Sequence, residues 1–237
     1  MRTWILFVLL FCSGCQVTNK PKAHGVALVI GLTEVDPRSY SGWHGECPGT
    51  DTDARIFEIL CQEFKYPVTK LINAQATRAA VKNQMARLTK DLEPGDLFVF
   101  FISCHGGQIK DINNDEEDGQ DETICLWDGE LKDDELLWPN CRTFFVTDSC
   151  NSGTNVRYRP NDVPSTGNLL HFGGCPDGKS SFGDSSGGTF TTALVDSWVE
   201  GQSYSDWFSN ASRLMPKNQR PVLMEYGTSF KNREAMK

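Results

Sequence analysis

The sequence lacks a long apolar segment, an excess of basic residues and an abundance of histidine. The N-terminal apolar run Trp4–Phe11 is too short to span a bilayer. Lys and Arg number 23 against 31 Asp and Glu, so the net charge of −8 argues against nucleic acid as a partner. The apolar content of 39% excludes a disordered chain, and 237 residues are enough for one domain with a real core.

The N-terminus has the pattern of an export segment. Arg2 precedes the apolar run, and Cys12-Ser13-Gly14-Cys15 follows it and resembles the lipobox of bacterial lipoproteins. We therefore expect residues 1–15 to be a signal peptide, residues 16–23 a tether, and the protein to be exported and lipid-anchored at Cys15. Secretion or periplasmic release after ordinary cleavage, and an uncleaved anchor, remain alternatives.

Seven cysteines follow the export segment, and they contain no Cys-x-x-Cys pattern that would predict a zinc site. An odd number suits one catalytic thiol plus six others. Disulfides among those six are compatible with an oxidising compartment, but their spacing fixes no pairs. Buried free thiols are an equally good interpretation.

Two apolar runs each end in a reactive residue. Residues 97–102 run into Ser103-Cys104-His105-Gly106, and residues 143–147 run into Asp148-Ser149-Cys150. Continuous apolar runs of this length are typical of buried parallel strands. Active sites of open α/β sheets lie beyond the carboxyl ends of such strands. The two runs therefore deliver a histidine and a cysteine to one sheet edge, as a Cys–His nucleophilic pair requires.

The remaining pattern predicts an α/β domain over residues 24–226, followed by a C-terminal tail at 227–237. Further strands are expected at 26–31, 67–72, 169–173 and 221–225, and helices at 51–64, 77–92, 189–199 and 203–214, with a short helix near 133–138. Strands alternating with helices indicate a mostly parallel sheet. The Gly- and Ser-rich stretch 173–188 is expected to form a loop near the active site.

Several segments together resemble the metacaspases, within the caspase-like cysteine peptidases. His105-Gly106, Asp148-Ser149-Cys150 and Ser152-Gly153 carry the resemblance, and 45 positions separate the histidine from the cysteine. The other matching segments are Asp53-Ala54, Pro94-Gly95-Asp96, residues 118–122, 133–135, 174–177 and 187–191. The similarity spans about residues 24–226 and implies a three-layer caspase-like sandwich with about six strands in its central sheet.

Two positions depart from the family pattern. Cys104 stands where glycine usually precedes the histidine, and Asn151 stands where histidine usually follows the cysteine. Neither departure removes a catalytic group.

The resemblance implies a role for each residue of the dyad. Cys150 would be the nucleophile, and His105 the general base that later protonates the leaving amine. The backbone N–H groups of Cys150 and Gly106 would form the oxyanion hole.

Asp148 and Asp53 are the candidate substrate-binding residues. The resemblance implies that they line the primary specificity pocket and select Arg or Lys before the scissile bond. Asp51 is a rival to Asp53 because both lie in one turn. A helix cap is the alternative role of Asp53.

The stretch from Asp111 to Glu135 holds twelve carboxylates and one cation, Lys132. It does not match an EF-hand, because Glu116 stands where that loop needs glycine. The resemblance implies calcium as an activator, with Asp128, Asp133 and Asp134 as candidate ligands. A solvated acidic loop is the alternative. No cofactor is expected for the chemistry itself.

These observations predict a cysteine endopeptidase acting on peptides or proteins after Arg or Lys. The resemblance further implies a monomer, with the membrane reached only through the lipid anchor. Self-cleavage is expected at one of three basic sites in loops, Arg157, Arg159 or Lys179. The alternative is a catalytically silent caspase-like lipoprotein that serves as a binding or scaffold protein.

Overall fold

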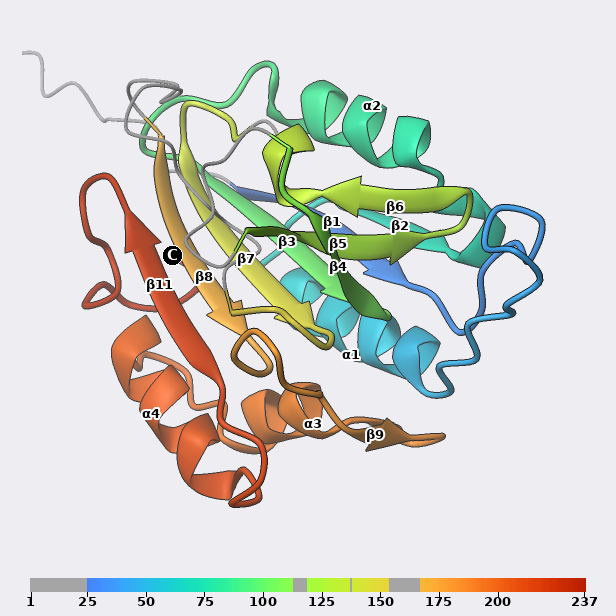
Figure 1. The fold of residues 1–237 in the computed structure, drawn as a ribbon. Coiled ribbons are helices and arrows are strands. Elements are labelled where there is room, and N and C mark those ends of the chain that lie inside the picture. Colours follow the sequence, from blue (N-terminus) through green and yellow to red (C-terminus); the bar gives the residue numbers. More distant parts are fainter. Residues whose placement is uncertain (1–24, 113–118, 137, 154–166) are drawn as a thin grey trace, which may run out of the picture.

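A mostly parallel six-stranded sheet forms the centre of the molecule (Figure 1). The computed structural model describes residues 25–112, 119–136, 138–153 and 167–237. The strand order is β11-β8-β7-β3-β1-β2, and β11 alone runs antiparallel to its neighbour. Their bounds are β1 Gly25–Gly31, β2 Val68–Ile72, β3 Leu97–Ser103, β7 Arg142–Asp148, β8 Asn168–Gly173 and β11 Val222–Tyr226. The six predicted strands and the parallel sheet are thus confirmed.

Two layers cover this sheet, because its central strands are apolar on both faces. Every residue of β3 is buried, and alternate side chains point to opposite faces. Val99 and Phe101 join the core beneath helices α1, α3 and α4, while Phe98 and Phe100 join the core beneath α2. The helices are α1 Thr50–Glu63, α2 Arg78–Thr89, α3 Thr189–Asp196 and α4 Tyr204–Leu214. The predicted sandwich of three layers is therefore confirmed.

A small antiparallel sheet shares the α2 side of the molecule and was not predicted as strands. It consists of β4 Gly106–Lys110, β5 Gln120–Leu126 and β6 Gly129–Lys132. Ile124, Leu126 and Leu131 bury their side chains in the same core as Phe98 and Phe100. The predicted helix near 133–138 is only a 3₁₀ turn, η2 Asp133–Glu135. The minor elements are η1 Asn73–Gln75 and the hairpin of β9 Gly183–Asp184 with β10 Gly187–Gly188.

Residues 227–237, assigned above to a tail, pack against the domain. Phe230, Ala235 and Met236 are buried in the core beneath α4. The Tyr204 hydroxyl accepts the Met236 N–H at 3.0 Å, and Arg142 donates to the Lys237 carbonyl at 2.7 Å. This segment is therefore structurally part of the domain.

The described residues bear on two expectations, one about membrane-spanning helices and one about the oxidation state of the cysteines. No helix in the described ranges is long and apolar enough to cross a membrane. The predicted signal peptide and tether lie outside those ranges. The seven cysteines after residue 15 are all free thiols, and five of them are buried. The structure thus matches the free-thiol interpretation of these residues.

Candidate active site

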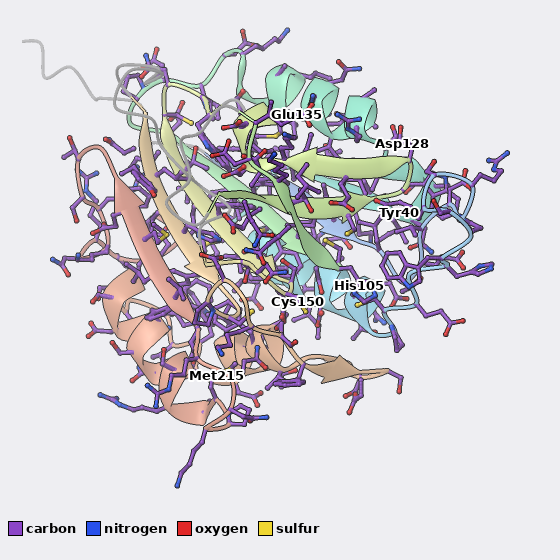
Figure 2. The ribbon with its side chains drawn as sticks, viewed as in Figure 1. Tyr40, His105, Asp128, Glu135, Cys150 and Met215 are labelled. Atoms are coloured by element: carbon purple, nitrogen blue, oxygen red, sulfur yellow. The ribbon has the colours of Figure 1, made fainter. Side chains whose placement is uncertain are left out.

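The register of β3 and β7 fixes the relation between the candidate histidine and cysteine. Ser103 pairs with Asp148 at the carboxyl ends of these adjacent parallel strands. The Cys104 N–H continues the pairing to the Asp148 carbonyl at 3.4 Å. His105 and Cys150 each follow two residues beyond the paired ends, and both line one cavity of about 260 Å³. The structure therefore brings the predicted pair to one site, and Figure 2 shows the two residues near each other.

Gly106 lies where the two strand ends meet. A Cβ atom built on Gly106 would lie 2.0 Å from the Cys150 carbonyl oxygen, closer than any side chain can tolerate. Only glycine lets the two backbones approach this closely. The backbone segments predicted to form an oxyanion hole are thus adjacent.

His105 is oriented by a backbone carbonyl and by an aromatic ring. Its Nε2 lies 3.1 Å from the Glu46 carbonyl oxygen. A carbonyl only accepts hydrogen bonds, so in the neutral ring Nε2 carries the hydrogen and Nδ1 is the basic nitrogen. The Trp43 ring lies with its centroid 5.0 Å from that of the imidazole. These contacts give His105 the tautomer that a general base needs.

Asn151, one of the two departures from the family pattern, has a backbone role after the nucleophile. Its φ of 49° is in the left-handed region, which asparagine tolerates better than most residues. Its side-chain oxygen accepts the Gly178 N–H at 2.9 Å, and its own N–H donates to the Lys179 carbonyl at 3.1 Å. Asn151 thereby joins the Cys150 turn to the 173–188 loop, which does lie at the cavity as predicted.

Asp148 lies buried at the cavity and is held by three donors. One carboxylate oxygen accepts from the Ser181 hydroxyl at 2.5 Å. The other accepts from the Thr191 N–H and the Thr191 hydroxyl, each at 2.8 Å. Burial raises the pKa of Asp148 despite these bonds. The donors are neutral, so the carboxylate remains without a counterion among the described residues.

Asp53, in the first turn of α1, also lines the cavity, beside Asp148. It accepts the Ser103 hydroxyl at 2.7 Å and the Gly188 N–H at 2.9 and 3.0 Å. Burial, followed by the nearby Asp148 charge, raises the pKa of Asp53 to about 7. The helix begins after Gly49, and the Asp53 N–H donates to the Gly49 carbonyl, so Asp53 is not the cap of this helix. Its rival Asp51 is exposed and does not line the cavity.

Gly188 separates the two carboxylates. A Cβ atom there would lie 2.1 Å from an oxygen of Asp148 and 3.0 Å from an oxygen of Asp53. The two oxygens therefore face the same small space. Among the described residues that line the cavity there is no Lys or Arg. Two buried carboxylates therefore lie side by side at the floor of the cavity without a described cation.

Comparison with known proteins agrees with this geometry. The family described as "Caspase domain" matches residues 24–231. The chain belongs to the caspase family. It is 34% identical over 149 residues to Metacaspase-1 of Ajellomyces capsulatus and 32% identical over 163 residues to Metacaspase-1A of Aspergillus oryzae. These alignments cover 54% and 60% of this chain but only 40% and 36% of those relatives.

Two solved structures resemble the whole caspase-family domain described above. Protein GSU0716 of Geobacter sulfurreducens superposes with a TM-score of 0.79 at 32% identity, covering 90% of this chain and 98% of that one. Caspase-1 of Spodoptera frugiperda superposes with a TM-score of 0.62 at 14% identity, covering 90% and 89%. The caspase-like fold is therefore established, and this member of the caspase family has metacaspase relatives.

The candidate calcium ligands of this caspase-family chain do not all lie together. Asp128 is exposed in the β5–β6 turn, where its carboxylate accepts the Arg78 N–H at 2.7 Å. Asp133 and Asp134 lie in η2, at the other end of β6. Four extended residues separate these ends by about 13 Å, far more than one ion can bridge with ligands at about 2.5 Å. Asp128 and Asp133 therefore cannot share an ion in this arrangement.

Asp133 instead lies among other carboxylates. It is buried, and burial together with Asp134, Glu122 and Asp121 raises its pKa to about 7. Within the described ranges no three acidic, Cys or His side chains already form a metal-binding group.

Three cavity residues were missed by the sequence analysis. Glu46 acts through its backbone, which any residue type could supply, so the sequence carries no signal for it. Cys47 lines the cavity, and burial, followed by the Asp148 charge, raises the pKa of its thiol to about 11. Ser181, the donor to Asp148, lies in the loop expected near the site, but serine is too common in that loop to single out.

Proposed function

We propose that this caspase-family peptidase is an endopeptidase that cleaves after Arg or Lys, using Cys150 and His105. The paired carboxylates of Asp53 and Asp148 carry the proposal. They lie on the floor of the cavity that Cys150 also lines, and no cation neutralises them among the described residues. A basic substrate side chain would supply the missing counterion, whereas an acidic one would be repelled.

The first half-reaction would use the two residues that share the cavity. The Cys150 thiol gives its proton to Nδ1 of His105, and the thiolate attacks the carbonyl carbon before the scissile bond. The N–H groups of Gly106 and Cys150 would stabilise the oxyanion. The carbonyl of Glu46 holds the imidazolium by accepting from Nε2.

The second half completes the hydrolysis. His105 returns the proton to the leaving amine, the C–N bond breaks, and the thioester to Cys150 forms. His105 then removes a proton from water, which attacks the thioester. The acid product leaves and the thiol of Cys150 is regenerated.

The two-carboxylate floor favours arginine over lysine. A planar guanidinium can donate in two directions at once and can contact Asp53 and Asp148 together. An ammonium is a compact charge that gains less from the pair. We expect arginine peptides to be cleaved with a kcat/KM about tenfold higher than that of lysine peptides.

Matched fluorogenic peptides ending in Arg, Lys, Asp or Asn test the proposal. Turnover of the basic peptides by the wild type, absent in Cys150→Ala, would support it. A folded protein that cleaves none of the four peptides, with and without calcium, would contradict it and favour the scaffold alternative. Rapid alkylation of Cys150 by an arginyl chloromethyl ketone gives a second readout that needs no turnover.

We also propose calcium as an activator, bound near η2. Asp133 and Asp134 would provide ligands, and Asp121 fits this group better than Asp128 does. One carboxylate oxygen of Asp121 is buried and has no hydrogen-bond partner among the described residues, and its other oxygen accepts from Lys132 at 2.6 Å. Carboxylate oxygens are the ligands that Ca²⁺ prefers.

Calorimetric titration with Ca²⁺ tests this assignment. Asp133→Asn should weaken binding and raise the calcium concentration needed for activity. Asp128→Asn should leave calcium binding unchanged and only remove the bond to the start of α2. The reverse outcome would restore Asp128 as a ligand.

Export and lipidation at Cys15 remain proposals that rest on the sequence alone. Incorporation of labelled palmitate into the wild type but not into Cys15→Ser would support the anchor. A monomer is likewise proposed, and light scattering of the purified protein tests it.

Self-processing at Arg157 or Arg159 is also proposed; both residues lie outside the described ranges. Lys179 is exposed, but its carbonyl accepts from Asn151 and from the Cys175 thiol. Cleavage after Lys179 would therefore disturb the turn after the nucleophile. Mass spectrometry of protein incubated with calcium, beside Cys150→Ala, identifies the site.

A further inference from the structure

Trp43 stands at the candidate active site without a role in the steps above. It lies in the loop between β1 and α1, and its side chain is 46% exposed. Its ring centroid lies 5.0 Å from that of His105, with the ring planes tilted by 53°. A large apolar surface is thus presented to solvent directly beside the candidate general base.

The indole is held in place although half of it is exposed. The Tyr40 ring packs edge-on against it with the ring centroids 5.7 Å apart, and the backbone N–H of Trp43 donates to the Tyr40 carbonyl at 3.0 Å. Tyr40 is anchored in turn, because its hydroxyl donates to the Leu126 carbonyl at 2.6 Å. Val35 further closes the loop by donating to the His44 carbonyl at 2.9 Å. An exposed aromatic ring fixed in this way loses little entropy when it binds an apolar group.

The chemistry of His105 places one part of the substrate beside Trp43. A general acid must come within about 3 Å of the leaving amine nitrogen. That nitrogen belongs to the residue after the scissile bond, so this residue begins next to the imidazole. In the view of Figure 2, His105 lies between Cys150 and Tyr40, which packs on Trp43. The leaving residue therefore lies within reach of the indole.

We propose that Trp43 forms the wall of the subsite for the residue after the scissile bond and selects an apolar or aromatic side chain there. This inference rests on the proposed peptidase function. It adds a second specificity element, on the leaving-group side, to the acidic floor that selects the residue before the bond. Glu46 is exposed in the same loop and would further disfavour an acidic residue at that position.

Internally quenched peptides that differ only after the cleaved arginine test the proposal. We expect the wild type to cleave a phenylalanine or leucine peptide with a kcat/KM about tenfold higher than that of glycine, and aspartate more slowly still. In Trp43→Ala the ratio of phenylalanine to glycine should fall below about twofold, and Trp43→Phe should restore most of it.

A coumarin amide of the same arginine peptide separates selection from a general effect on His105. If Trp43 only positions the imidazole, Trp43→Ala slows every substrate equally and leaves the ratio unchanged, which would overturn the proposal. Phe182 is the matched control, because it is equally exposed at 46% and lies at the cavity on the 173–188 loop, whereas Trp43 lies beside His105. Phe182→Ala should leave the ratio unchanged.

Two further outcomes are decisive. A wild type that cleaves the coumarin amide but shows no preference among the quenched peptides overturns the role of Trp43 while the peptidase stands. A wild type that cleaves neither kind of substrate removes the peptidase function, and the subsite with it.

Discussion

Two groups of buried carboxylates differ in how their charge is compensated. Asp53 and Asp148, at the end of the central sheet, accept only from hydroxyls and backbone N–H groups. Asp121, in the small antiparallel sheet, is paired with Lys132 at 2.6 Å. Burying an unpaired charge is costly, so the first pair is stabilised best by a cation from outside the chain. The second group already has a cation of its own, with which calcium must compete.

The largest expected effect comes from removing Asp148, the acid of the first pair that ends β7 two residues before Cys150. Asp148→Asn should lower kcat/KM for arginine peptides by about 1,000-fold, because the substrate cation loses a desolvated partner. Alkylation of Cys150 by iodoacetamide should be nearly unchanged, which separates loss of binding from loss of the nucleophile. Equal losses in both measurements would show that Asp148 supports the fold around Cys150 instead.

Asp53→Asn should have a smaller effect, about 100-fold on kcat/KM, because the pKa of Asp53, raised to about 7, already leaves part of this carboxyl uncharged near neutral pH. The preference for arginine over lysine should also shrink, since a single carboxylate cannot use both arms of a guanidinium. A preserved preference would mean that arginine contacts Asp148 alone.

The same residue should make substrate binding depend on pH. The pKa of Asp53 is raised to about 7, so the carboxyl is increasingly protonated below that pH and binds a cation poorly. The KM for arginine peptides should therefore rise by up to about tenfold per pH unit below 7. A KM in the wild type that stays flat from pH 5.5 to 8 would contradict a proton on Asp53. Asp53→Asn should remove this dependence.

Stability should change with pH in the opposite direction to substrate binding. Between the ordinary pKa near 3.8 and the folded pKa near 7, the folded state binds more protons at Asp53 than the unfolded state does. The free energy of unfolding therefore falls as pH rises through this window. Asp53→Asn should raise it by about 2 kcal/mol at pH 8 and by little at pH 4, as measured by urea denaturation.

The smallest effect is expected in the second group. The Lys132 side chain is 25% exposed, so Lys132→Met should lower the free energy of unfolding without calcium by about 1 kcal/mol. It should also tighten calcium binding several-fold, because the competing cation is gone. Weaker calcium binding in this variant would place the ion away from Asp121.

Most of the central sheet could be predicted because its strands are uninterrupted apolar runs. The helix starts at Thr77 and Ser203 could also be predicted, because these residue types favour the N-cap position. Each side chain accepts an N–H group of the first turn at 3.1 Å, from Ala80 and from Asp206 respectively. The antiparallel sheet was missed because β5 opens with Gln120, Asp121 and Glu122, which have the composition of a loop. Burial of those two acids depends on tertiary partners, which no local pattern reveals.

The candidate active site also has a part that the sequence predicts and a part that it does not. His105, Cys150 and Asp148 follow apolar strands, so topology alone brings them together. The position of the Glu46 carbonyl and the contact between Asp53 and Gly188 depend on the conformations of two loops. A backbone group is present in every residue type, so the sequence does not indicate which one will be used. The sequence did not predict the separation of Asp128 from Asp133, because β6, the strand that lies between them, was not predicted.

The bond between the Gly188 N–H and Asp53 joins positions 135 residues apart. The strands that lie between them complete four parallel pairings, β1–β2, β1–β3, β3–β7 and β7–β8, and each of these pairings closes a long loop and forms slowly. During synthesis Cys150, His105 and the paired carboxylates are therefore separate pieces, and they combine only when the segment containing Gly188 has docked. Under the proposed function, the order in which this topology assembles would keep a newly made chain from cutting itself or its neighbours.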